Sequence, residues 1–545
     1  MAGHTPTLPA PFSNAVSPLL NDLYQVTMAY AYFKGGRHEE HAVFDLFFRK
    51  HPFKGEFTIF AGLEECLRLV DHFGFTADDI EYIRETLPGV SEPFLEWLAG
   101  LSTAGVTVKA IAEGSVVFPR LPLLRISGPL GVCQLLETTL LNLVNYASLM
   151  ATNAARFVQA AGPDARLLEF GLRRAQGPDG GMSASKYSYM GGFHGTSNVA
   201  AGKAFGIPIR GTHAHSFVCS FVSLDDVPDP TVTSADGSRS VNLATEAAGC
   251  LTELGFDAET TNAGEFAAFV AYAVAFPDTF LALVDTYSTL DSGVPNFMAV
   301  ALALARLGYQ PRGIRLDSGD LAALSIAARN MFAAAASQLA SDPAAALAFR
   351  NLNIVASDSI NEAFLHTIAE SGHSIDTFGI GTNLVTCQAQ PALGCVFKLV
   401  QIGDAPRIKL SQNIAKVTVP GAKLAYRLHG HDEFPILDVM VLESEEPPRA
   451  GEPFLCRHPL NEGERVRVKP RSVEPLLTTL YSDSSVVGEL PSLESVRSHC
   501  LVQQGVFKPQ TQVKHPSPYR VYLSDALYTL LHDLWLRETA VPELS

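Results

Sequence analysis

The chain has 545 residues, of which 47% are hydrophobic and 18% are charged. That length is too great for one hydrophobic core, and that composition is typical of globular domains and excludes a largely disordered chain. Lys and Arg number 40 against 56 Asp and Glu, a formal charge of −16, so we expect neither nucleic acid nor a membrane as a partner. A pocket for an anionic ligand must therefore gather positive charge locally.

The cysteines, the amino-terminal residues and the longest apolar stretch together predict a cytoplasmic protein. The eight cysteines are scattered, with no CxxC pair and no Cys/His cluster at zinc spacing, which is typical of reduced thiols. Residues 1–16 have neither an apolar signal core nor an arginine-rich pattern, and they predict a short disordered tail. Residues 130–161 are apolar but interrupted by Gln, Glu and Asn, so they predict a core helix and no membrane span.

The pattern of the sequence changes twice along the chain. Residues 42–48 and 106–126 show short alternating β runs broken by Gly and Pro, which indicates an antiparallel sheet. Within 161–400, strand-like runs (RLLEF, IPIRGT, FLALVDTY, GIRLD, NIVASD) alternate with alanine-rich helical stretches, and this predicts an irregular α/β barrel. β patterns return after residue 400. We therefore expect an α/β protein in which residues 17–160 and 401–545 form one discontinuous, sandwich-like α+β domain.

Four glycine-rich, charge-bearing segments follow strand-like runs. They are EFGLRRAQGPDGG from Glu169, GTHAHS from Gly211, GIRLDSGDL from Gly313 and GIGTNLV from Gly379. Strand ends at one edge of a sheet would direct their Arg, His and Asp side chains and their backbone amides toward one pocket. This combination suits a phosphorylated sugar and indicates an enzyme.

The GIGTNLV segment is a candidate phosphate site. Gly379 and Gly381 end an apolar run, and Thr382 or Asn383 is placed to begin a helix, so free amides at a helix amino end would face an anion. An ordinary turn between a strand and a helix has the same pattern, and the segment alone does not distinguish the two.

Arg315 and Asp317 lie on the same side of an extended segment. A guanidinium can hold a phosphate or carboxylate with two hydrogen bonds, and an aspartate accepts hydrogen bonds from ribose hydroxyls, so the pair suits a ribosyl ligand. A structural ion pair is the alternative. The aspartates form no complete metal cage, although Mg²⁺ needs only one or two carboxylates when a diphosphate supplies further oxygens.

The GTHAHS segment places His213 and His215 two residues apart after a strand-like run, so that both can face one side. HxH spacing can ligate a metal, but the sequence offers no clear third ligand, and no metal site is assigned. A nucleophilic or acid/base histidine is the other interpretation, and the neighbouring Thr212 and Ser216 hydroxyls favour a polar pocket.

These segments, together with LLNDLYQVTMA from Leu19, LVDTYST and PRIKLS, occur in an order that resembles the nicotinate phosphoribosyltransferase family of NAD salvage. The resemblance implies an irregular α/β barrel, which is the phosphoribosyltransferase domain, plus an open sandwich-like domain. It also implies homodimers with active sites at the interface. The implied reaction joins nicotinate to 5-phosphoribosyl 1-diphosphate, giving nicotinate mononucleotide and diphosphate with coupled ATP hydrolysis and Mg²⁺ or Mn²⁺.

The resemblance also assigns residues by position. His215 matches a histidine phosphorylated by ATP, and Asp317 and Arg315 complete the expected catalytic group. The residues expected to bind nicotinate are Phe170, Arg173, Ser197, Thr212, Arg315 and, arriving from the other subunit, Tyr24. Those expected to bind the phosphoribosyl diphosphate are Asp317, Gly381, Thr382 and Lys409. The role of His213, which lies where the family is expected to have an apolar or small residue, stays open.

Ser197 favours an acid over an amide as the acceptor. Similar nicotinamide-using enzymes carry an aspartate there, and that carboxylate would repel a nicotinate carboxylate. Alternative functions are a nicotinamide or quinolinate phosphoribosyltransferase, or a catalytically silent homologue that binds phosphosugars. The nicotinate nitrogen needs no deprotonation to attack, and the absence of an obvious general base in the sequence is consistent with that.

Overall fold

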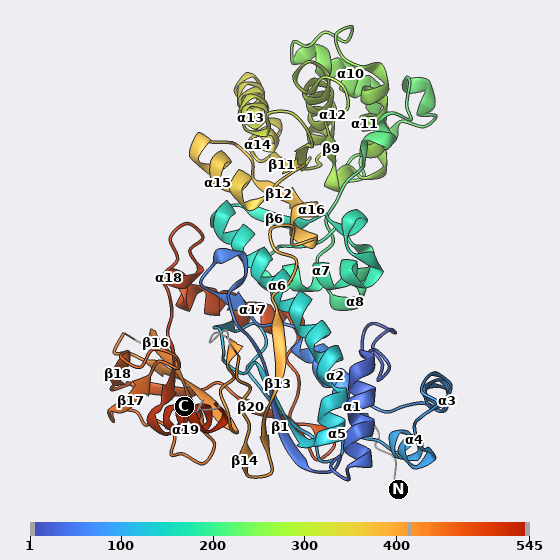
Figure 1. Cartoon of the computed structure of the whole chain (residues 1–545). Helices are drawn as coiled ribbons and strands as arrows, with labels where there is room; N and C mark the ends of the chain where they lie inside the picture. The colour runs from blue at the N-terminus through green and yellow to red at the C-terminus, as the bar shows by residue number, and fades with distance from the viewer. Residues whose placement is uncertain (1–5, 412–415, 433, 540–545) are drawn as a thin grey trace, which may run out of the picture. The chain divides into compact units, whose positions relative to one another are not determined.

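The computed structural model describes residues 6–411, 416–432 and 434–539. The chain forms two compact units, both discontinuous in sequence (Figure 1). The first unit comprises Met1–Ala155, Met190–Gly192 and Ala389–Ser545, and the second comprises Arg156–Tyr189 and Phe193–Gln388. Among the described residues, no helix is long and apolar enough to cross a membrane.

A largely antiparallel sheet joins the two flanks of the chain within the first unit. Its strand order is β14-β13-β1-β5-β3-β20-β21. The bounds are β1 His41–Phe48, β3 Thr107–Ala110, β5 Leu124–Pro129, β13 Cys395–Ile402, β14 Ala405–Pro406, β20 Thr478–Ser482 and β21 Ser485–Val486. Strand β1 pairs with β13, and the stacked rings of Phe44 and Phe397 lie 4.8 Å apart. The predicted discontinuous α+β part is therefore confirmed, because apolar strands about 350 residues apart in sequence bury each other.

A second sheet of the first unit has the order β18-β17-β22-β16-β15-β19. Its strands are β15 Lys423–His429, β16 Pro435–Leu442, β17 Phe454–Arg457, β18 Arg465–Val468, β19 Ser472–Pro475 and β22 Val521–Ser524. Alternate side chains of β15 and β16, Leu428, Leu437 and Val439 among them, form a buried cluster with Tyr522. The period of two in these strands produces this core, since every second side chain faces it.

Helices and short strands complete the first unit. They are α1 Leu23–Lys34, η1 Pro52–Lys54, β2 Thr58–Ile59, α2 Leu63–Asp71, α3 Ala77–Thr86, α4 Glu92–Ala99, β4 Val116–Val117, α5 Leu130–Leu135, α6 Glu137–Ala161, α17 Leu493–Val506, α18 Lys508–Thr511 and α19 Asp525–Glu538. The apolar stretch 130–161 forms α5 and α6, which continues into the second unit. Part of the predicted disordered tail is held in place, because the Thr7 and Leu8 amides donate to Asp71 at 2.6 and 2.7 Å.

The second unit is built on a parallel sheet with the order β6-β12-β11-β10-β9. The strands are β6 Arg166–Glu169, β9 Leu281–Leu283, β10 Gly313–Leu316, β11 Asn353–Ser357 and β12 Thr377–Ile380. Isolated parallel bridges through Thr196 and Ile209 continue the sheet beyond β6. The segment IPIRGT, predicted as a strand, contributes only that bridge at Ile209. The predicted barrel is thus an open half-barrel of parallel strands.

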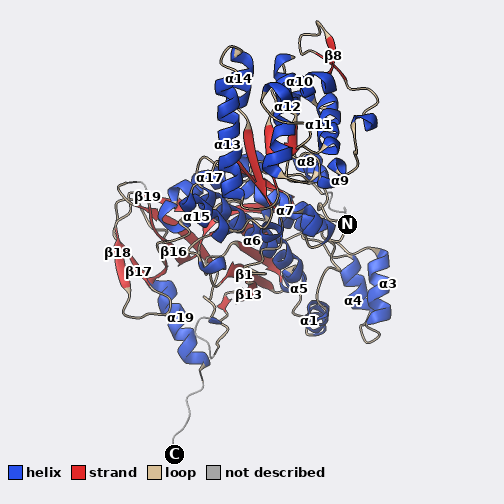
Figure 2. Ribbon diagram, turned by 90° about the horizontal axis from the view of Figure 1, so that it is seen from above, coloured by secondary structure: helices blue, strands red, loops and turns tan. Residues whose placement is uncertain are grey.

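Helices follow the strands of this sheet, as the alternating pattern predicts (Figure 2). They and the remaining elements are η2 Leu172–Arg174, α7 Gly177–Gly191, α8 Val199–Phe205, α9 His215–Val218, η3 Leu224–Asp226, β7 Thr231–Thr233, β8 Ser240–Asn242, α10 Leu243–Glu253, α11 Ala263–Ala275, η4 Pro277–Thr279, η5 Thr289–Gly293, α12 Val294–Arg306, α13 Leu321–Gln338, α14 Pro343–Arg350, α15 Glu362–Ser371 and α16 Thr382–Val385. Helix α13 illustrates why these segments form helices. It is alanine-rich, and the Asp320 carboxylate caps it by accepting from the Ala323 amide at 3.0 Å.

Candidate active site

The parallel register places the carboxyl ends of all five strands at one edge of the sheet, and polar residues follow directly after them. Arg315 pairs with Val355 across β10 and β11, and Ile380 pairs with Glu169 across β12 and β6. The loops after these strands therefore emerge side by side. Asp285 follows β9 and Asp317 follows β10, so both carboxylates lie at this edge.

His215 is the first residue of α9 and lies among these carboxylates. Its Nδ1 hydrogen-bonds with Thr286 Oγ1 at 3.1 Å. Its Nε2 lies 3.9 Å from Asp285 Oδ1 and 3.7 Å from Asp317 Oδ2. The ring is 42% exposed, so one nitrogen is held by a hydroxyl while the other faces two carboxylates in a site open to ligands.

Arg315 and Asp317 are joined directly, with Arg315 Nη2 at 3.5 Å from Asp317 Oδ2. The Asp317 backbone amide donates to Asp285 Oδ2 at 2.9 Å, and Ser357 Oγ donates to Asp317 Oδ1. Three separate strands therefore orient one aspartate. His215, Arg315 and Asp317, predicted as the catalytic group, lie together in this arrangement.

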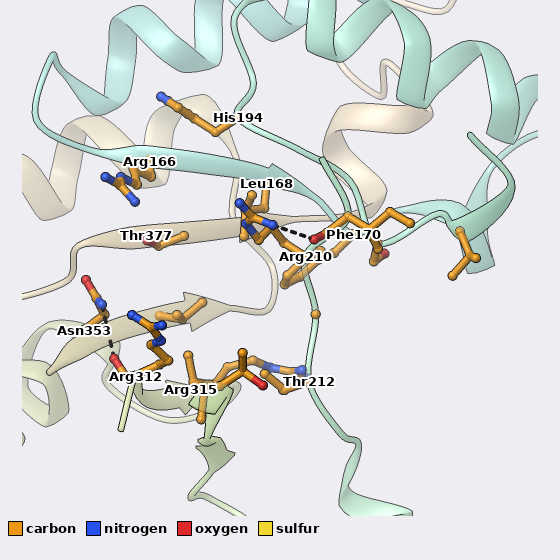
Figure 3. Close-up of a pocket in the computed structure, with 17 residues that line it drawn as sticks. Arg166, Leu168, Phe170, His194, Arg210, Thr212, Arg312, Arg315, Asn353 and Thr377 are labelled. Carbon is orange, nitrogen blue, oxygen red and sulfur yellow. Dashed lines mark hydrogen bonds between the residues drawn. The ribbon is translucent and has the colours of Figure 1, made fainter. Parts of the chain in front are cut away.

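A cavity of about 1160 Å³ lies along one face of the sheet, lined by alternate residues of its strands. Among the residues expected to bind nicotinate, it is lined by Phe170, Ser197, Thr212 and Arg315 (Figure 3). The Phe170 ring lies directly over Gly379, where a Cβ atom would come within 2.3 Å of the ring. Gly379 thus lets the aromatic ring pack on β12, a role different from the phosphate contact that its segment predicts.

The remaining predicted residues are placed as follows. Gly381 and Thr382 lie where β12 gives way to α16, and the Phe170 amide donates to Ile380 O at 2.8 Å beside them. Arg173 lies in η2, is exposed, and is not among the residues that line the cavity. Tyr24 and Lys409 belong to the first unit.

Several polar residues of the site are evident only from the structure. Glu169 is completely buried, and its carboxylate accepts hydrogen bonds from the Gly171 amide, Ser185 Oγ and Thr196 Oγ1. Its own backbone carbonyl accepts from the Ser197 amide at 2.9 Å. Glu169 thereby holds the segments of Phe170 and Ser197 together. Like Asp285 and Ser357, it ends or follows a parallel strand, which is the signal that could have identified it.

His213 turns away from the reacting edge. The residue is 8% exposed, and its ring packs against the rings of Phe217 and Tyr272, with centroids 5.4 and 4.9 Å away. Its Nε2 accepts from the Leu283 amide at 3.3 Å. Burial lowers the pKa of His213 to about 4, so the residue is neutral at pH 7. The two histidines of GTHAHS therefore occupy different environments.

The described residues contain no group of three or more His, Cys, Asp or Glu side chains arranged as a metal site. Asp285 and Asp317 nevertheless fit a cation whose remaining ligands come from a diphosphate, because Mg²⁺ is often bound by one or two carboxylates. Asp285 Oδ1 is buried and has no hydrogen-bond partner, which leaves that oxygen available.

An open parallel sheet with cationic, acidic and aromatic side chains at its carboxyl edge is typical of the active site of an α/β enzyme. Models of the nicotinate phosphoribosyltransferase family match the chain: the N-terminal domain at residues 19–145, the family domain at 165–429 and the C-terminal domain at 422–531. The chain belongs to the nicotinate phosphoribosyltransferase family.

Individual relatives match this chain over nearly their whole lengths. The chain is 52% identical to nicotinate phosphoribosyltransferase 1 of Arabidopsis thaliana, with 98% of this chain and 96% of the relative covered. It is 46% identical to nicotinate phosphoribosyltransferase of Homo sapiens, over 95% and 97% of the two chains. The crystal structure of human nicotinic acid phosphoribosyltransferase superposes with a TM-score of 0.85 at 44% identity, covering 94% and 99%.

Proposed function

We propose that the protein transfers the phosphoribosyl group of 5-phosphoribosyl 1-diphosphate to nicotinate, giving nicotinate mononucleotide and diphosphate in NAD salvage. The observation that carries the proposal is the meeting of His215, Arg315 and Asp317 at one edge of a cavity that Phe170 and Ser197 line. One end of this arrangement suits a planar aromatic acid, and the other suits an anionic sugar.

In the proposed reaction, the pyridine nitrogen forms a bond to the anomeric carbon while the bond from that carbon to the diphosphate breaks. The electron pair leaves with the diphosphate, and positive charge builds on the ribose. The Asp317 carboxylate stabilises that charge, and Ser357 and the backbone fix its position. Phe170 orients the acceptor ring by stacking, and no proton has to be removed from the nitrogen.

The proposal includes ATP coupling through a phosphohistidine. The γ-phosphoryl group of ATP passes to an imidazole nitrogen of His215, with ADP as the other product, and water later removes it. The half-exposed ring, held by Thr286, supports this role. Asp285 and Asp317 would hold Mg²⁺ (or Mn²⁺), which neutralises phosphate charge when it is bound.

The test of this coupling is His215→Ala, with the exposed His431→Ala as the matched control. We expect the His215 variant to lose ATP stimulation and phosphate uptake from γ-labelled ATP while it keeps slow, ATP-independent synthesis. The control should match the wild type. Unchanged ATP stimulation of the purified His215 variant would refute the phosphohistidine.

Three acceptors separate the proposed reaction from its alternatives. We expect product from nicotinate, and little from nicotinamide or quinolinate, when each is supplied with phosphoribosyl diphosphate and analysed by mass. Synthesis from nicotinamide alone would refute the assignment. Binding of phosphoribosyl diphosphate without any product would favour a catalytically silent homologue.

We further propose a cytosolic homodimer in which Tyr24 and Lys409 serve the site of the other subunit. Eight cysteines without a disulfide support the cytosol. Exposed Leu23 and Tyr24, at 60% and 47%, support a contact surface on α1. Mixing Tyr24→Ala and His215→Ala chains tests the shared site: mixed dimers should regain ATP-stimulated activity that neither variant has alone. No recovery after verified subunit exchange would refute a shared site.

A further inference from the structure

The cavity extends beyond the residues used so far, to the amino edge of the parallel sheet. Arg166, Asn353 and Thr377 are the first residues of β6, β11 and β12, and all three line it. Arg312, which directly precedes β10, lines it as well. Phe170 is the fourth residue after Arg166, which corresponds to about 13 Å of extended chain. The cavity therefore has two ends, and only the carboxyl end contains the proposed reacting groups.

The two arginines at the amino end carry charge that no carboxylate of the described residues neutralises in an ion pair. Arg312 Nε donates to the backbone carbonyl of Asp278 at 3.1 Å. A nearby carboxylate, Asp376, is already paired with Arg329 at 2.6 Å. Both Arg166 and Arg312 are exposed to solvent, and Figure 3 shows their guanidinium groups at the same end of the cavity. In a chain with a formal charge of −16, this is a local concentration of positive charge.

Between the two ends apolar side chains form much of the wall, and Arg210 also lines the cavity, beside Leu168 (Figure 3). Leu168, Ile209, Leu281 and Val355 line its middle part. A volume of about 1160 Å³ also exceeds what a single pyridine ring with one carboxylate fills. Positive charge at the mouth and apolar walls behind it match the two parts of an aromatic carboxylate. Phosphate or diphosphate has no apolar part that would favour these walls.

We propose that the amino end of the cavity is an entrance and first binding position for the aromatic acid acceptor. Arg166 and Arg312 receive the carboxylate, and the ring then passes along the apolar walls to Phe170. This inference rests on the proposed function, in which the phosphoribosyl diphosphate occupies the carboxyl edge beside His215 and Asp317. The acid reaches its stacking position from the opposite edge without crossing the sugar.

The test uses the full-length enzyme with Arg166→Gln, Arg312→Gln and the double variant. Arg350→Gln is the matched control, because Arg350 is an exposed arginine of the same unit that does not line the cavity. In the double variant we expect kcat/KM for nicotinate to fall about tenfold at low salt, since local positive charge raises association rates. The KM for phosphoribosyl diphosphate and the Tm should match those of the wild type, and the difference should shrink at high salt.

A second variant tests the route independently of charge. Asn353→Trp places a large ring at the amino end, and it should lower kcat/KM for nicotinate while leaving the KM for phosphoribosyl diphosphate unchanged. Nicotinate constants equal to wild type in both the double arginine variant and Asn353→Trp would overturn the inference. So would an equal loss of affinity for phosphoribosyl diphosphate.

Calorimetric titration with nicotinate alone separates this inference from the proposed function. We expect the double arginine variant to bind nicotinate about tenfold more weakly than Arg350→Gln does. If the wild type makes no nicotinate mononucleotide but its nicotinate binding depends on the two arginines, the proposed function fails and the entrance position stands. Equal nicotinate binding by both variants refutes the entrance position whatever the activity.

Discussion

Two clusters of charged residues, one in each unit, contain the same kinds of side chain in different geometry. In the first unit, Arg427 makes a fork to Asp438, with Nε–Oδ1 at 2.9 Å and Nη2–Oδ2 at 3.0 Å, and both side chains are at most 2% exposed. In the second unit, His215, Arg315 and Asp317 are separated by 3.5 to 3.7 Å and are 16 to 42% exposed.

The difference distinguishes a structural cluster from one prepared for a ligand. The Arg427 guanidinium also donates to Val116 O at 3.0 Å and to Gln503 Oε1 at 3.3 Å, and it lies 4.6 Å from the Phe507 ring centroid, so groups of the protein surround it. In the cluster at His215 the distances between charged groups are longer, the side chains are more exposed, and the hydrogen bonding is incomplete. Short, closed charge pairs serve the fold, whereas loose pairs at a cavity leave space for a substrate.

The substitution Arg427→Ala tests this comparison most directly, and we expect it to have the largest effect on stability. The substitution leaves the Asp438 carboxylate buried without its partner, so we expect a loss of about 3–5 kcal/mol in the free energy of unfolding of the first unit. Denaturant titration followed by fluorescence measures it. Turnover per folded molecule should stay the same. A loss below about 1 kcal/mol would mean that the closed pair contributes little to the fold.

For Asp317→Asn we expect lost activity with unchanged stability, the opposite of the outcome for Arg427→Ala. Removing the charge beside the reacting ribose should lower kcat about 10²- to 10³-fold, while the Tm stays within about 2 °C because the side chain is partly exposed. Steady-state kinetics and thermal melting check both statements. Asp320→Asn is the control, since asparagine preserves the cap of α13. Equal kinetics for the two variants would contradict the role of Asp317.

His213 allows a pH test beside the same site. Burial lowers the pKa of His213 to about 4, whereas an unfolded histidine has a pKa near 6.5. Between these values only the unfolded chain takes up the proton, so stability falls as pH drops from about 6.5 to 4, by about 1.4 kcal/mol per unit. Denaturation midpoints over this range should fall less steeply for His213→Gln. Identical slopes would show that His213 titrates normally.

The smallest expected effect concerns acceptor choice. Ser197→Asp places a carboxylate at the cavity wall, and repulsion should raise the KM for nicotinate about tenfold while improving the use of nicotinamide. Ser341→Asp adds the same charge at an exposed turn of the same unit and is the control. An unchanged KM for nicotinate would contradict the charge argument at Ser197.

Local patterns account for the part of the fold that the sequence predicts correctly. The β runs, the alanine-rich helices and the α/β alternation depend on residues close together in the chain, and the structure confirms them. The run at residues 207–212 is an exception. It has the composition of a strand, but only Ile209 forms a bridge, because pairing depends on a neighbour from elsewhere in the chain.

The residues of the candidate site likewise fall into those that the sequence indicated and those that only the structure revealed. The sequence pattern indicated Arg315, Asp317 and the histidines of GTHAHS, because charged residues in glycine-rich turns after apolar runs mark the carboxyl ends of parallel strands, and the family resemblance selected His215. It did not indicate the buried carboxylate of Glu169, the partners Asp285 and Ser357, or the different environments of His213 and His215.

The sequence by itself determined the types of element and the chemistry that each loop carries. The order of the strands, the opening of the half-barrel and the second, arginine-lined end of its cavity were decided only by the tertiary structure. The physical reason is that periodicity and turn chemistry act over a few residues. Strand neighbours, burial and the meeting of charges depend instead on contacts between segments that lie far apart along the chain.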